Sequence, residues 1–188
     1  MNKTGQRSLA LLLALLALSW PLLASARTEE QLIQDLESAD SGKVKSALGQ
    51  LQKHYPTSTK SLSAIKKALK DSRSEIRRKA ARALGSLHAE VDQTNIRDLC
   101  ALLKASDLNE VEDGLKALRG LKAPEAVPAI LPLLRHRSAN IVRDACRTLA
   151  VLGNKDTIPS IEPLLKNAEP EVMKDAKDAI SKLRSKKS

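Results

Sequence analysis

The chain repeats one pattern five times, and this recurrence limits its possible folds more than any single motif does. Five stretches align without gaps on a small residue that is followed four positions later by leucine or isoleucine. Successive copies lie 33, 34, 31 and 31 residues apart. Self-similarity at a period of about 20 to 50 residues is typical of solenoids and other repeat architectures. The small-residue column contains Ala47, Ala80, Gly114, Ala145 and Ala176.

A second apolar pattern precedes the first in the copies. In the fourth copy it consists of Val127, Ile130 and Leu134, which lie at i, i+3 and i+7. That spacing places apolar side chains along one face of a helix. Each copy therefore predicts two amphipathic helices, and connections of about five residues require these helices to lie antiparallel.

Stacked helix pairs predict an all-α fold, an α-solenoid of about five antiparallel pairs over residues 27–184. One pair alone buries too little apolar surface to offset the entropy lost on ordering it, whereas stacked pairs share a core. The basic tail 185–188 is expected to be disordered. We place the units at about residues 28–58, 59–92, 93–123, 124–154 and 155–184.

Several helix starts match capping patterns. Thr28 with Gln31, and Ser72 with Glu75, have the spacing of a capping box, in which each side chain bonds to the backbone of the other residue. Pro170 fits the first turn of the last helix, where its missing N–H costs nothing.

Residues 1–26 carry the pattern of a secretory signal peptide. A basic start is followed by the apolar run 9–23 and by a small-x-small site at residues 24–26. The alternative, a retained membrane anchor, needs about 20 apolar residues, and the run here is shorter and is interrupted by Pro21. We expect cleavage after Ala26, a periplasmic or secreted product, and no stable membrane span after cleavage.

Composition excludes some kinds of partner. The net charge of +10 falls to +8 when Lys3 and Arg7 leave with the leader, so the mature chain is basic. Tyr55 is then its only aromatic residue. Because stacking of aromatic side chains on bases supports much single-stranded nucleic-acid binding, no nucleic-acid partner is expected. Cys100 and Cys146 both lie in apolar helical patterns, which favours buried free thiols over a disulfide.

Two strings, residues 125–153 and 156–183, resemble HEAT repeats, and most closely the short HEAT-like units named from phycobilisome lyases. The resemblance extends over residues 28–184. The first unit departs from the pattern because it lacks the proline of the first helix, and the third has acidic Glu112 where the fourth has a basic residue. The residues of the fourth unit that match the pattern are Val127, Pro128, Leu133, Leu134, Val142, Arg143, Ala145, Leu149 and Gly153.

No group of residues in the sequence has the spacing expected of a catalytic site. His54, His88 and His136 lie in three separate units, and none has a second histidine or a cysteine at i+3 or i+4. The resemblance includes a di-iron hydroxylase with His-Glu ligand pairs, but no His-Glu dipeptide occurs here. We therefore predict a non-enzyme with no metal and no cofactor.

A basic residue recurs at the Arg143 position of the second helix in four units, and an acidic residue occupies the next position in the last three units. Two interpretations are open: a basic binding stripe, or a structural ladder in which cations bond acids of neighbouring units. The adjacent acids favour the ladder, although exposed pairs stabilise little, up to about 1 kcal/mol each. In the last two units the ladder would use Arg143, Asp144, Lys174 and Asp175.

The second unit is unusually basic, with a local charge of +6 over residues 66–82. Packing does not explain this excess, so the segment is either a solvated basic face or an anionic binding patch. The candidate binding residues are Lys66, Lys67, Lys70, Arg73, Arg77, Arg78 and Arg82.

These observations lead to two functional hypotheses. The first is a non-catalytic, exported interaction or scaffold module that binds an unidentified protein partner on the curved face of the solenoid. The alternative is an electrostatic binder of anionic envelope polymers or lipid head groups through the basic second unit.

Overall fold

The computed structural model describes residues 27–87 and 92–186, and over these residues it is helical without a strand. The predicted signal peptide, residues 1–26, lies outside the described residues. The first three units each contain two α-helices: α2 (Glu29–Asp35) and α3 (Ser41–His54), α4 (Thr59–Ala68) and α5 (Ser74–Ser86), α6 (Gln93–Leu102) and α7 (Leu108–Gly120).

In the last two units the first helix is divided into short α and 3₁₀ (η) segments. Pro128, Pro132, Pro159 and Pro163 lie in these segments and cannot donate the backbone hydrogen bonds of a regular helix. The sequence pattern predicted uninterrupted helices here and did not show this division. The segments are η1 (Pro124–Ala126), α8 (Val127–Ile130), η2 (Leu131–Arg135) and the long α9 (Ala139–Leu152), then η3 (Lys155–Thr157), α10 (Ile158–Ile161), η4 (Glu162–Lys166) and the long α11 (Pro170–Ser185).

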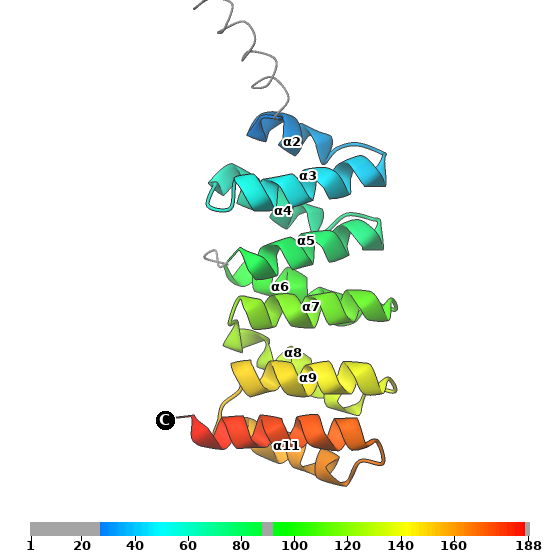
Figure 1. The fold of residues 1–188 in the computed structure, drawn as a ribbon, viewed down its shortest axis with the longest axis vertical. Helices are drawn as coiled ribbons and strands as arrows, with labels where there is room; N and C mark the ends of the chain where they lie inside the picture. The colour runs from blue at the N-terminus through cyan, green and yellow to red at the C-terminus, as the bar shows by residue number, and fades with distance from the viewer. Residues whose placement is uncertain (1–26, 88–91, 187–188) are drawn as a thin grey trace, which may run out of the picture.

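The helix pairs stack in one direction, as Figure 1 shows. The second helices α3, α5, α7, α9 and α11 lie side by side in one layer, and each contacts the next. The first helices form a second layer behind them. The predicted α-solenoid of five antiparallel helix pairs is confirmed.

The core is a continuous apolar seam between the two layers and between successive units. Leu51, Leu84, Leu118 and Leu149 are fully buried in one column of the second helices, and Ile180 continues it in α11. At about 25 cal/mol per Å² of apolar surface removed from water, such side chains each stabilise the fold by roughly 1.5–3 kcal/mol.

The column one residue after the small-residue column contains Cys146 and forms an inter-unit contact. Leu48, Ala81, Leu115 and Cys146 are all fully buried in this column. Its last member, Lys177, is exposed on α11, where no further unit follows within the described residues. A buried position in four units is therefore occupied by a charge at the end of the stack.

Some local predictions hold and others fail. Thr28 and Gln31 form the predicted capping box at α2. Ser72 does not cap α5, because the N-cap residue is Arg73, which makes no side-chain cap. Glu75 is instead 2.8 Å from the ammonium of Lys45 in the preceding unit, which lowers the pKa of that carboxyl.

The expected disorder of the tail from residue 185 is wrong for its first two residues. Ser185 is the last residue of α11. Lys186 donates through Nζ to the backbone carbonyls of Val151 and Gly153, each at 2.6 Å. These carbonyls lie at the end of α9, where a cation satisfies acceptors that have no partner in the helix. Residues 187–188 lie outside the described residues.

The second helices α5 and α7 approach each other most closely at two glycines. A methyl group built on Gly85 would lie 2.6 Å from the Cα atom of Ala117, and one on Gly120 would overlap the carbonyl of Gly85. No side chain fits between these two backbones. The contact therefore requires glycine for space, although glycine weakens a helix by roughly 0.5–1 kcal/mol.

We predict that Gly120→Ala lowers the free energy of unfolding by about 2 kcal/mol, because the new methyl group pushes α5 and α7 apart. Urea denaturation monitored by circular dichroism measures the change. Gly49→Ala is the matched control: its methyl group would lie 3.5 Å from the flexible end of Lys79, so the better helix propensity of alanine should leave stability unchanged or raised. Equal destabilisation by both variants would contradict this account of the α5–α7 contact.

Candidate functional site

The arginines of the basic second unit lie in the joint between units and bond acids of the third. Both oxygens of the Glu110 carboxylate accept hydrogen bonds from Arg77, one of them 2.8 Å from a terminal nitrogen. Glu110 is only 2% exposed and Arg77 is 24% exposed. Arg78 donates through Nε to Asp113 at 2.9 Å. The bond to Glu110 raises the pKa of the Arg77 guanidinium, so the group stays charged.

Arg73 faces the opposite joint, toward the first unit. Its guanidinium donates to both oxygens of Asp71, at 2.9 and 2.8 Å, and to the backbone carbonyls of Ser38 and Ala39, each at 3.1 Å. The hydrogen bond from Arg73 lowers the pKa of Asp71. This arginine therefore ties the loop before α3 to the loop before α5.

The lysines of the cluster also face acids, on the first-helix layer. Lys66 lies 3.3 Å from Asp92, Lys70 lies 3.1 Å from Asp98, and Lys67 lies 3.7 Å from Glu37. These pairs are more exposed than the Arg77 pair, and each stabilises the fold by at most about 1 kcal/mol.

The candidate binding residues within 66–82 therefore form ion pairs inside the fold. This corrects the expectation that packing does not explain the basic excess. Each candidate binding residue lies within 4 Å of an acid, and the longest of these distances is 3.8 Å, between Arg82 and Asp113. Most of these acids belong to the first and third units, and the net charge over the three units, residues 28–123, falls to +3.

The residues proposed for the ladder differ in what they contact. Arg143 donates to Asp175 at 2.8 Å and to Glu171 at 2.9 Å, from α9 to α11. Asp144 faces Arg147 of its own helix at 3.4 Å rather than a neighbouring unit, so the expected inter-unit rung is absent there. Lys174 is exposed on α11 without an ion pair among the described residues, which corrects its assignment to the ladder.

The candidate reactive side chains are dispersed. His54 is exposed at the end of α3, and His136 accepts through Nδ1 from the backbone N–H of Ser138. His88 lies outside the described residues. Both cysteines are free, and burial raises the pKa of the Cys146 thiol to about 12. The described residues contain no group of three or more His, Cys, Asp or Glu that could hold a metal ion.

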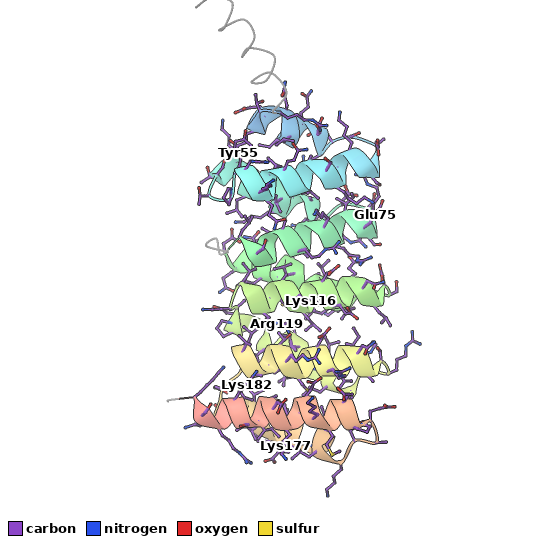
Figure 2. The ribbon with its side chains drawn as sticks, in the orientation of Figure 1. Tyr55, Glu75, Lys116, Arg119, Lys177 and Lys182 are labelled. Carbon is purple, nitrogen blue, oxygen red and sulfur yellow. The ribbon has the colours of Figure 1, made fainter. Side chains whose placement is uncertain are left out.

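A hollow of about 400 Å³ lies over α9, between α7 and α11. It is on the outer face of the second helices, the face that points away from the first helices. Ala150, Val151 and Ala179 supply its apolar surface, and Val151 is 42% exposed. Arg119 and Lys182 line it from α7 and α11, on either side of α9 (Figure 2). Sequence reasoning missed this site. Its other lining residues are Arg147, Asp175 and Asp178.

Two further hollows lie on the first-helix layer. One, of about 400 Å³, is lined by Ile33, Leu36 and Ala68 near the start of the solenoid. The other, of about 660 Å³, lies between the proline-containing segments of the last two units, with Leu131 and Leu164 in its lining. Neither places ionisable side chains in a catalytic arrangement.

Taken together, the layers and their repeated contacts define an α-solenoid. Residues 96–181 match the family of HEAT repeats, and the chain shares the fold of a HEAT-like repeat structure. A search of curated proteins finds no match. None of the described helices combines the length and apolar character needed to cross a membrane.

Solved structures share the fold. The chain is similar to the complex of CpcE and CpcF of phycocyanin lyase from Nostoc sp. PCC7120, with 25% identity and a TM-score of 0.72 over 86% of this chain. It spans 66% of that chain, just under two thirds of its length. An engineered protein matches at 23% identity with a TM-score of 0.64, over 85% of this chain and 81% of its own. A designed armadillo repeat protein in complex with the peptide (KR)4 matches at 18% identity with a TM-score of 0.61, over 81% and 80%.

We predict that Arg77→Ala lowers the free energy of unfolding by about 3 kcal/mol, because it leaves the buried Glu110 carboxylate without its partner. Urea denaturation measures this loss. Lys67→Ala is the control, because its pair with Glu37 is exposed on both sides and its removal should change stability by less than about 0.5 kcal/mol.

The double variant Arg77→Met with Glu110→Met should recover most of the lost stability, because it removes both charges and keeps the volume. A double variant as unstable as Arg77→Ala would mean that the arginine stabilises the joint through something other than this pair.

Proposed function

We propose that the chain is an exported, non-catalytic scaffold that binds a partner protein on the outer face of its second helices. The observation that carries the proposal is the contrast between the two kinds of surface charge. Recurring cations such as Arg78 and Arg143 bond acids of neighbouring units. The hollow beside Val151 exposes an apolar side chain and cations that packing does not use.

The fold supports a binding role. HEAT and armadillo repeat scaffolds commonly bind proteins, and the designed armadillo protein similar to this chain holds a peptide. A solenoid also presents a long surface that a partner can follow across several units.

The fold alone does not decide against catalysis, because the similar CpcE and CpcF chains belong to a lyase. The side chains support a non-catalytic role. Burial raises the pKa of both thiols, which weakens them as nucleophiles at neutral pH, and the described histidines lie in different units. The hollow contains cations and carboxylates but no histidine, cysteine or serine.

The alternative, electrostatic binding of anionic polymers through the second unit, has less support. Arg77 and Arg78 are occupied by Glu110 and Asp113, and an anionic ligand would have to displace these acids. Reversing the arginines to glutamate would place carboxylates against carboxylates in the joint. Loss of binding in such a variant would therefore report loss of folding.

Site-specific photo-crosslinking in the native host tests the proposed function. A photoreactive residue at Val151 should crosslink a protein, whereas one at Leu165, which is 38% exposed on the other layer, should not. Comparable exposure makes Leu165 a matched control. Crosslinking only at Leu165 would place the partner elsewhere. Turnover of a substrate by the purified chain, with no protein crosslinked at either position, would contradict a non-catalytic scaffold.

Export predicts a defined N-terminus. Protein recovered from the host should begin at Arg27, as measured by N-terminal sequencing of the full-length gene product. Ala24→Arg should block this processing, because a cleavage site needs a small residue at that position. A recovered chain that still begins at Met1 would contradict the predicted leader.

A further inference from the structure

The hollow beside Val151 forms because α9 has short side chains at positions where its neighbours α7 and α11 have long ones. Arg119 of α7 and Ala150 of α9 occupy one repeat column, and Val151 of α9 and Lys182 of α11 occupy the next column. Small residues on the middle helix thus lie between long cationic residues on its two neighbours. Figure 2 shows Arg119 and Lys182 toward the C-terminal ends of their helices, with α9 between them.

The cations on the two sides of the hollow are not neutralised by the fold. Arg147 lies 2.9 Å from Asp175, so its charge is already compensated. Neither Arg119 nor Lys182 has an ion pair within residues 27–87 and 92–186. Asp178 is the one acid of the lining without an ion pair in the same part of the chain, so the two free cations outnumber it.

The other hollows offer no comparable arrangement. The three cations that line the hollow near α2 all have acidic partners: Lys67 with Glu37, Lys70 with Asp98, and Arg73 with Asp71. The proline-lined hollow contains one cation, Arg135, at an otherwise mostly apolar surface. Of these three hollows, the one on the second helices combines free cations on both sides with an apolar centre.

We propose that this hollow binds an extended acidic segment of the partner protein, an inference that rests on the proposed function. One carboxylate of the segment meets Arg119, a second meets Lys182, and an apolar side chain between them covers Val151. Arg119 lies on α7 and Lys182 on α11, and α9 lies between these helices. Their axes are therefore roughly 16–20 Å apart. An extended segment spans that distance with about six residues.

The choice of an extended peptide follows from shape and charge. Apolar surface at Ala150, Val151 and Ala179 favours a ligand that carries apolar side chains as well as charge. The unpaired cations select carboxylates and disfavour a basic segment, because unpaired like charges at an interface are costly. The (KR)4 peptide held by the similar designed protein has the opposite charge to the segment proposed here.

Fluorescence anisotropy with short labelled peptides tests the proposal. The probe has two glutamates about six residues apart with a valine midway between them, and matched peptides replace both glutamates by lysine or by glutamine. The full chain should bind the glutamate peptide at low ionic strength, more weakly as salt is added, and should bind the other two much less.

The decisive variant is Arg119→Glu with Lys182→Glu, which should weaken binding of the glutamate peptide by about tenfold or more. The matched control is Arg97→Glu with Arg137→Glu, because both residues are exposed, neither has an ion pair among the described residues, and the change in net charge is identical. The control should change binding by less than about twofold. Thermal unfolding by circular dichroism should show that both variants fold like the parent chain.

Equal weakening by the control variant would overturn the proposal, because binding would then depend on net charge alone. Equal binding of the lysine or glutamine peptide would overturn it as well. Inorganic polyphosphate serves as a polymer probe, and its binding through Arg119 and Lys182 in preference to the glutamate peptide would identify a different class of ligand and also overturn it. Crosslinking of a partner at Val151 that survives the Arg119→Glu, Lys182→Glu change would keep the proposed function and remove only the acidic segment.

Discussion

Burial of a leucine stripe between successive helix pairs is the interaction on which the rest of the structure depends. A pair on its own would leave the Leu84 or Leu118 side of its second helix in water, and each such side chain gains its roughly 1.5–3 kcal/mol only when a neighbour covers it. This requirement brings the second helices into one layer and makes their spacing regular. At Gly85 and Gly120 it brings two backbones into direct contact.

The ion pairs depend on this stacking. Arg77 reaches Glu110 and Arg143 reaches Asp175 because the apolar seam already holds α5 against α7 and α9 against α11. A buried or half-buried pair recovers in Coulomb energy little more than it loses in desolvation. We infer that these pairs mainly fix how one unit is rotated on the next, since a slipped joint would leave the Glu110 carboxylate buried and unpaired.

The repeat period was sufficient to predict the fold, because a solenoid needs only recurring apolar columns and short connections. The partners in the joints were harder to predict. Arg77 and Glu110 are 33 residues apart, close to one repeat period, and a comparison of each cation with acids one unit away could have found this pair. Periodicity does not show the divided first helices or the arginine that replaces Ser72 as the N-cap, because both depend on local backbone geometry. The hollow at Val151 was missed because it arises from differences between units, whereas the sequence comparison searched for what the units share.

Lys177 makes the exposed face of α11 a poor joint for a further unit. Leu48, Ala81, Leu115 and Cys146 show that the fold buries this position whenever another unit follows. A sixth unit added after α11 would have to desolvate the Lys177 ammonium without a partner, at a cost of several kcal/mol. A further unit would therefore need either a change at this lysine or an acid of its own that pairs with it, as Glu110 pairs with Arg77. Lys177 therefore opposes an apolar joint on the exposed face of α11, and replacing it with alanine or leucine is the first step for anyone who wishes to build a longer version.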